Sequence, residues 1–198
     1  MDLPSIRWAI CPGIPPATRA LAPQLPPMLA QLLYNRGIVG AAPEILEHFL
    51  NPRWEDGLHD PFLLADMDRA VARILEAIDR HEPIGVFGHY DADGITALVL
   101  LTETLAYLNA TVIPYLPNRC DDYGVNENGI AELSRQGVRL LISVDSGIRS
   151  FNAPQVAAHA GIDLIITDHH TVLRASDEDV LPPALAVINP LRADCYYP

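Results

Sequence analysis

Acidic and imidazole side chains gather in three short segments, and each segment directly follows an apolar run. The first is GHYDADG at 88–94, the second is DSG at 145–147, and the third is DHH at 168–170. Carboxylate oxygens and imidazole nitrogens, with no thiolate among them, suit Mn²⁺ or Mg²⁺ better than Zn²⁺. Two such ions about 3.5–4 Å apart are the usual arrangement for cutting phosphate esters. The segments therefore predict a two-ion phosphoesterase site.

The spacing favours four of these residues as metal ligands. Asp91 and Asp93 flank one small residue, so a tight loop can aim both carboxylates at the same ion pair. Asp145 follows the strand that we expect in the middle of the three, and this position is the best one for bridging two ions. His169 is the natural imidazole ligand.

Other residues are candidates for catalysis and for phosphate binding. We expect Asp168 to orient a neighbouring imidazole, and His170 to face the substrate phosphate as hydrogen-bond donor or general acid. Gly94 opens a helix whose N-terminus favours an anion. Asn118 and Arg119 follow another strand and are weaker candidates for a phosphate contact. Each segment alone also fits a surface turn or a helix cap, but three of them after apolar strands favour a site.

The apolar runs and their spacing predict an α/β fold. Apolar strands without alternation, separated by helices, imply a mainly parallel five-stranded sheet with helices on both faces. The expected strands are 84–87, 111–116, 140–144, 164–167 and 184–188. The expected helices are 28–35, 43–50, one that starts from an N-cap at Asp66, 95–108, 128–136 and 153–160. Helix 95–108 is apolar on most faces, and we expect it to be buried.

Composition restricts the class of protein. The 198 residues carry a formal net charge of −12, which argues against a basic nucleic-acid-binding surface within this chain. The three cysteines lack metal-ligand spacing and suit free thiols in a reducing compartment. No apolar run reaches the roughly 20 residues that span a bilayer, and we expect a cytoplasmic protein. The remaining histidines are assigned to packing or to the solvated surface.

At DHH the sequence resembles the DHH phosphoesterase superfamily, for which this triplet is a signature. GHYDADG is similar to its first motif, VDSGI to its second and TDHHT to its third. Other segments resemble the RecJ-like exonucleases of that superfamily: RW at 7–8, RGI at 36–38, FLNPRW at 49–54, LHDPFLLADMDRA at 58–70, LPNRCDDYGVN at 116–126 and VINP at 187–190. The resemblance implies two Mn²⁺ or Mg²⁺ ions and 5′→3′ hydrolysis of single-stranded DNA, with DNA-repair or replication proteins as partners.

The resemblance also sets expectations for the domains. The prolines and two short predicted helices indicate a proline-rich helical arm at 1–65, and the resemblance implies a DHH phosphoesterase domain at 66–198. His89 stands where RecJ-like chains usually have Asp, and as an imidazole it remains a candidate ligand. RecJ-like chains continue beyond the point that matches Pro198, with a fourth motif, a second catalytic domain and nucleic-acid-binding modules. We therefore expect an N-terminal fragment with weak or no nuclease activity by itself.

Two other functions stay open at the level of sequence. One is a DHH phosphatase or phosphodiesterase that acts on oligonucleotides, cyclic dinucleotides or pyrophosphate. The other is a scaffold that keeps the fold without catalysis. The N-terminal segments favour the exonuclease over the first, and the retained DADG and DHH motifs disfavour the second.

Overall fold

The computed structural model describes residues 9–118, 124–176 and 178–198, and the chain divides into two compact units between Leu58 and His59. The first unit is helical, and three of its four helices begin at a proline, which is preorganised for the first helical position. Its helices are α1 (Pro16–Arg19), α2 (Pro27–Asn35), α3 (Pro43–Leu50) and α4 (Trp54–Gly57). A small apolar core holds it together, made of Ala22, Leu25, Ala30, Leu33 and Val39.

The second unit is built on a five-stranded, fully parallel sheet in the order β2-β1-β3-β4-β7. Its strands are β1 (Ile84–Phe87), β2 (Val112–Tyr115), β3 (Leu140–Val144), β4 (Asp163–Thr167) and β7 (Ala186–Ile188). The predicted α/β class and the parallel sheet are confirmed. β3 lies between β1 and β4, as the sequence predicted for the strand before Asp145.

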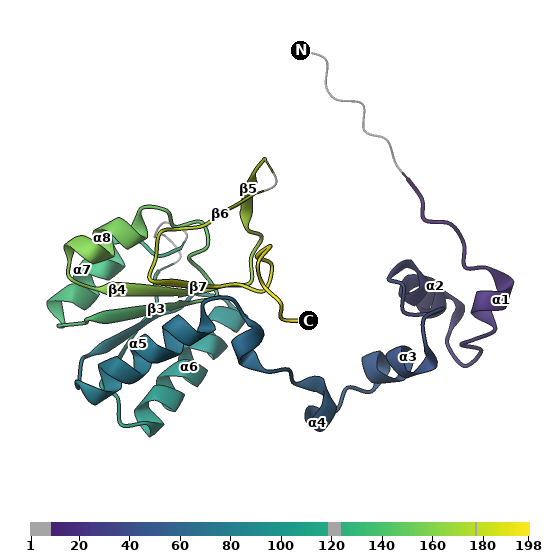
Figure 1. Cartoon of the computed structure of the whole chain (residues 1–198), viewed down its shortest axis with the longest axis horizontal. Helices are drawn as coiled ribbons and strands as arrows, with labels where there is room; N and C mark the ends of the chain where they lie inside the picture. Colours follow the sequence, from purple (N-terminus) through teal and green to yellow (C-terminus); the bar gives the residue numbers. More distant parts are fainter. Residues whose placement is uncertain (1–8, 119–123, 177) are drawn as a thin grey trace, which may run out of the picture. The chain divides into compact units, whose positions relative to one another are not determined.

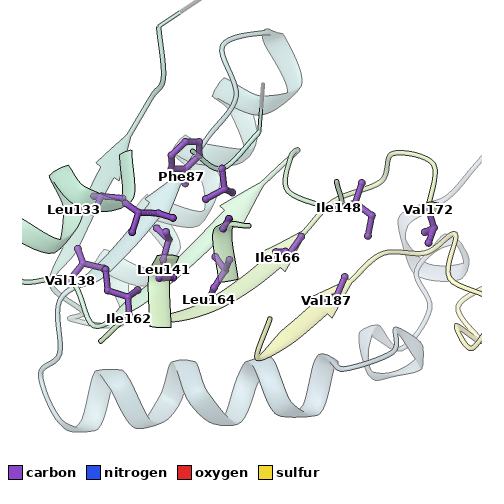
Figure 2. Packing of buried hydrophobic residues seen from close by; sticks show 14 residues of the cluster. Phe87, Leu133, Val138, Leu141, Ile148, Ile162, Leu164, Ile166, Val172 and Val187 are labelled. Carbon is purple, nitrogen blue, oxygen red and sulfur yellow. The ribbon is translucent and has the colours of Figure 1, made fainter. Parts of the chain in front are cut away.

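Helices cover both faces of this sheet (Figure 1). The unit begins with a short 3-10 helix, η1 (Pro61–Leu63), and its helices are α5 (Met67–Asp79), α6 (Ala92–Tyr107), α7 (Glu127–Arg135) and α8 (Ala153–His159). α5 and α6 pack on one face, and α7 and α8 on the other. Figure 2 shows the face covered by α7 and α8, where Leu141 and Ile166 of the sheet and Leu133 of α7 belong to one buried apolar cluster. Fully burying one such side chain stabilises the fold by about 1.5–3 kcal/mol.

The prediction that the helix after the first strand is buried was wrong. Leu98 and Leu105 of α6 pack against the sheet, but Val99, Leu100 and Tyr107 are exposed by 49%, 69% and 87%. Apolar residues on several faces of a helix do not reveal which of these faces packs against another element. Among the described residues, only the face of α6 with Leu98 and Leu105 does so. No helix in the described part of the chain is both long and apolar enough to cross a membrane.

A small antiparallel hairpin follows β4 and was not predicted. β5 (Leu173–Ala175) pairs with β6 (Glu178–Val180). Each strand has three residues and none is buried. The sequence therefore carries no apolar pattern that would predict these two strands. The Arg174 side chain donates a hydrogen bond to Asp179 at 3.0 Å and links the two strands.

Asp66 lies at the N-cap position of α5 but does not cap it with its side chain, and the predicted capping role is wrong. Its φ is 63°, in the left-handed region, and the carboxylate turns toward the edge strand β7. Oδ2 accepts hydrogen bonds from the Val187 amide at 3.1 Å and from Arg192 Nη1 at 2.7 Å. The Arg192 guanidinium also donates to the Val187 carbonyl. The outward backbone groups of Val187 are thus satisfied by side chains, which protects that edge from pairing with another strand.

Candidate metal centre

The predicted site residues meet beyond the carboxyl ends of three neighbouring strands. Asp91 follows β1 and caps α6, Asp145 follows β3, and Asp168 follows β4. Because the strands are parallel and adjacent, their carboxyl ends lie at one edge of the sheet, where such folds bind ligands.

Two groups of possible ligands share one residue. Asp91, Asp93 and Asp145 form the first group, and Asp145, His169 and His170 form the second; within each group the ligand atoms lie within 4.8 Å of one another. Asp145 Oδ1 is 2.9 Å from His169 Nε2, and Asp93 Oδ2 is 3.7 Å from the same nitrogen. The structure therefore brings together all four predicted ligands, with Asp145 at the centre.

The backbone at Asp145 is unusual. Its φ is 58°, in the left-handed region that residues other than Gly, Asn and Asp rarely adopt. The turn is fixed by the Ser143 hydroxyl, which donates to the Ser146 carbonyl at 2.8 Å. At Gly147, with φ of 115°, a Cβ would stand 2.8 Å from Ser143 Oγ, so only glycine fits. Backbone in such conformations is common at functional sites.

The carboxylates of the first group influence one another. Burial, assisted by the charges of Asp93 and Asp91, raises the pKa of the Asp145 carboxyl, against the opposing bond from His169. At Asp91, desolvation acts to raise the pKa, but the amide of Gly94 and the neighbouring Asp93 outweigh it and leave the pKa lowered. Carboxyls this close cannot all ionise easily without a cation between them.

Asp168 lies behind the two histidines. Its side chain is 1% exposed, and Oδ1 accepts hydrogen bonds from the amides of His169 and His170 at 2.8 and 3.1 Å. The same oxygen is 2.7 Å from His170 Nδ1, and Oδ2 accepts from the Ile148 amide at 2.9 Å. The bond to Asp168 is the main cause that raises the pKa of His170. This is the geometry expected of a carboxylate that orients an imidazole.

His89 and Gly94 lie beside the first ligand group. His89 is 5% exposed, its Nε2 is 3.7 Å from Asp91 Oδ2, and its ring packs against Tyr90. It belongs to neither ligand group. A Cβ at Gly94 would stand 2.5 Å from the Cβ of His89, and the Gly94 amide donates to Asp91 at 3.2 Å. A phosphate at that amide would have to compete with this bond, so the predicted anion contact at Gly94 stays a prediction.

The structure does not test the two phosphate contacts that were predicted after β2, Asn118 and Arg119. Arg119 lies outside the described residues. Asn118 is exposed and is the last described residue before Arg119. Both assignments stay predictions.

A cleft of about 670 Å³ opens beside the second ligand group. His170 and Asp168 form part of its wall, together with the start of α7 and the loop before α8. The loops are tied to one another, because Ser150 Oγ accepts from the Val125 amide at 3.0 Å and Arg149 Nη2 donates to the Thr171 carbonyl at 3.3 Å. The remaining lining residues are Asn126, Glu127, Asn128, Gly147, Ile148, Phe151, Asn152 and Ala153.

Asn189 was given no role from the sequence, and the structure places it at the site. It directly follows β7, is fully buried and donates a hydrogen bond to the His170 carbonyl at 2.9 Å. A polar residue followed by proline after the fifth predicted strand was the available signal, since that position shares the sheet edge with the other site residues.

Comparison with known proteins agrees with the geometry. A single-stranded-DNA-specific exonuclease RecJ from Bacillus subtilis (strain 168) is 36% identical over 98% of this chain, and one from Escherichia coli (strain K12) is 34% identical over 91%. The chain spans only 24% and 30% of those two relatives.

Solved structures give the same result. A RecJ in complex with Mn²⁺ from Thermus thermophilus matches 93% of this chain and 25% of its own, with a TM-score of 0.66 and 27% identity. An exonuclease RecJ bound to manganese matches 67% of this chain and 33% of its own, with a TM-score of 0.59 and 33% identity. Residues 83–196 match the family described as DHH family, N-terminal domain. The chain belongs to the DHH family.

Proposed function

We propose that this chain supplies the metal-binding part of a phosphodiesterase that removes nucleotides from single-stranded DNA in the 5′→3′ direction. The observation that carries the proposal is Asp145, which belongs to both ligand groups and so stands where one carboxylate would bridge two ions. The relatives that match most of the chain are named single-stranded-DNA-specific exonucleases, and two solved relatives hold manganese.

The donor set fits divalent ions. Asp145 Oδ2 is buried without a hydrogen-bond partner among the described residues, which is costly unless a cation contacts it. Asp91, Asp93, Asp145 and His169 would hold Mn²⁺ or Mg²⁺, and none of them is a thiolate. Bound ions would activate water and neutralise charge that develops on the phosphoryl oxygens.

Among the described residues, we assign His170, which lines the cleft, to face the substrate. Its Nδ1 is held by Asp168, so the ring is fixed while it lines the cleft. In the proposed reaction it donates a hydrogen bond to a phosphoryl oxygen or a proton to the leaving oxygen. Arg149 lines the same cleft and offers a cation for the nucleic-acid backbone.

The test uses a chimera in which this chain replaces the matching segment of the Bacillus subtilis relative. We expect Mn²⁺-dependent digestion of single-stranded DNA from the 5′ end, and loss of at least about 100-fold in rate with Asp145→Asn, since bridging ligands act on both ions. Asparagine is chosen because it tolerates the left-handed backbone of Asp145. Asp79→Asn, at an exposed position at the end of α5, serves as the matched control.

Full activity of the Asp145→Asn chimera would contradict the assignment of the metal centre. Hydrolysis of dinucleotides, cyclic dinucleotides or pyrophosphate in preference to long single-stranded DNA would instead favour the small-substrate activity. We extend the proposal to DNA-repair or replication proteins as partners and to a cytoplasmic location, because the matching relatives are DNA-processing enzymes.

A further inference from the structure

We propose that Asn189 is a positioning residue, which fixes the main chain of His170 at the edge of the metal centre. The inference rests on the proposed function only in taking His170 as a residue that faces the substrate. The way in which Asn189 holds the loop after β4 does not depend on that function, and amide hydrogen exchange tests it without an activity assay.

The side chain of Asn189 extends the ladder between β4 and β7 beyond its end. The register pairs Thr167 with Ile188, and the Asp168 amide donates to the Ile188 carbonyl at 3.0 Å. After that bond the backbones no longer pair, because β4 continues into the turn of His169 and His170. The amide nitrogen of the Asn189 side chain then donates to the His170 carbonyl at 2.9 Å and adds one more link between the two strands.

The orientation of the Asn189 amide is fixed from both ends. Nδ2 donates to the His170 carbonyl, and Oδ1 accepts from the Leu191 amide at 2.8 Å. Exchanging the oxygen and the nitrogen would bring two acceptors together at His170 and two donors together at Leu191. Asn189 is fully buried, and Pro190 after it favours an extended backbone at Asn189. A polar side chain that is buried and satisfied in this way adopts a single arrangement.

The strand that carries Asn189 is itself held in place. Val187, two residues earlier, is bonded on its outer side by Asp66 and Arg192. The Arg192 side chain is 6% exposed and also pairs with Asp194 at 2.7 Å. β7 therefore offers a rigid support from which Asn189 can act on the neighbouring loop.

His170 is consequently held at three points. Its amide and its ring Nδ1 both bond to Asp168 Oδ1, at 3.1 and 2.7 Å, and its carbonyl bonds to Asn189. The two bonds to Asp168 share one acceptor, so by themselves they allow the peptide unit after His170 to rotate. The Asn189 bond removes that freedom.

The experiment measures amide hydrogen exchange in the 198-residue chain carrying Asn189→Asp. Aspartate has the same size and still accepts from Leu191, but its ionised carboxylate cannot donate to His170. We expect the amides of His169 and His170 to exchange at least ten-fold faster, while the amides of Leu141 and Ile142 in β3 stay protected. The control Asn51→Asp, which loses the hydrogen bond that the Asn51 side chain donates to Glu47 in the first unit, should leave both pairs of amides unchanged.

A uniform increase across the sheet, or no change at His169 and His170, would overturn the proposal. Should Asn189→Asp not fold, Asn189→Ser replaces it, because the hydroxyl is too short to reach His170 and adds no charge; the same selective exchange is expected. In Asn189→Ser, which adds no charge beside the ring, a change in the ring ¹⁵N shifts of His170 at one fixed pH is the matching spectroscopic sign of an altered bond to Asp168.

In the chimera, Asn189→Asp should lower kcat on the order of ten-fold with KM for DNA unchanged. A raised KM with unchanged kcat would overturn the positioning role. An inactive wild-type chimera would instead reject the proposed function, and the exchange result would still decide whether Asn189 holds the loop.

Discussion

Asp145 combines three properties that rarely occur in one residue. It is 7% exposed, its backbone is left-handed, and one of its oxygens has no hydrogen-bond partner in the described part of the chain. Each of these costs free energy, and a strained, unsatisfied acid in the middle of a sheet edge is best explained by a ligand. The sequence predicted that Asp145 follows the middle strand of the three, because this position follows from strand order. It could not predict the backbone angle, which depends on Ser143 and Gly147 around it.

His169 and His89 should differ in their effect on metal affinity. His169 Nε2 lies 2.9 Å from Asp145, whereas His89 is stacked on Tyr90 and lies outside both ligand groups. We predict that His169→Gln weakens Mn²⁺ binding by at least about ten-fold and that His89→Gln weakens it by less than about three-fold. Calorimetric titration of the chain measures both, with thermal unfolding as a check on folding. An equal loss in the two variants would make His89 a ligand.

Asn189 illustrates what sequence reading misses at the scale of single residues. Its partner His170 is 19 residues away, and no periodicity or motif spacing relates the two. Only the register of β4 and β7 makes them neighbours. Asp168 was easier to assign, because it is adjacent to the histidine pair that it contacts.

At the scale of elements, the strands that line the site were the most predictable. β1 and β3 have the predicted bounds, 84–87 and 140–144, because they are short, mainly apolar runs that are buried on both faces. The hairpin of β5 and β6 was missed because half of the six residues in its strands are charged and none is buried. The prediction that α6 is buried failed for another reason. Which faces of a helix are covered depends on the elements that pack around it, and the sequence of the helix alone does not contain this information.

The edge strand β7 gives a prediction about acid stability. The bonds from Arg192 and the Val187 amide outweigh burial and lower the pKa of Asp66 from its ordinary value of 3.8. A carboxyl with a lowered pKa stabilises the fold above its unfolded pKa, and this contribution is lost as the pH falls through the folded value. Asp66→Asn should therefore destabilise the chain by about 2 kcal/mol at neutral pH, and the difference from wild type should shrink below about pH 4.

Urea unfolding at several pH values measures this difference. Asparagine keeps the left-handed backbone accessible, so the comparison isolates the charge. Asp163→Asn provides a comparison, since Asp163 also pairs with an arginine, Arg73. Unlike Asp66, Asp163 is half exposed, and it lies at the start of β4, at the end of that strand away from the metal centre. A pH-independent loss in Asp66→Asn would show that the carboxylate charge contributes nothing to holding β7.

At the scale of the whole molecule, every residue of the two ligand groups belongs to the unit after Leu58. That unit has its own two apolar clusters, one on each face of the sheet. We predict that a chain of residues 59–198 folds and binds Mn²⁺ within about two-fold of the 198-residue chain. Circular dichroism and metal titration measure the two properties. Loss of metal binding in a folded 59–198 chain would show that the first unit contributes to the centre.

The central claim is that Asp145 bridges two divalent ions. Electron paramagnetic resonance of the chain titrated with Mn²⁺ tests it most directly, because two Mn²⁺ ions about 3.5–4 Å apart are magnetically coupled. We predict a coupled pair in the wild-type chain, and no coupling in Asp145→Asn although its circular dichroism is unchanged. A single uncoupled ion in the wild-type chain, or coupling that survives in Asp145→Asn, would contradict the claim.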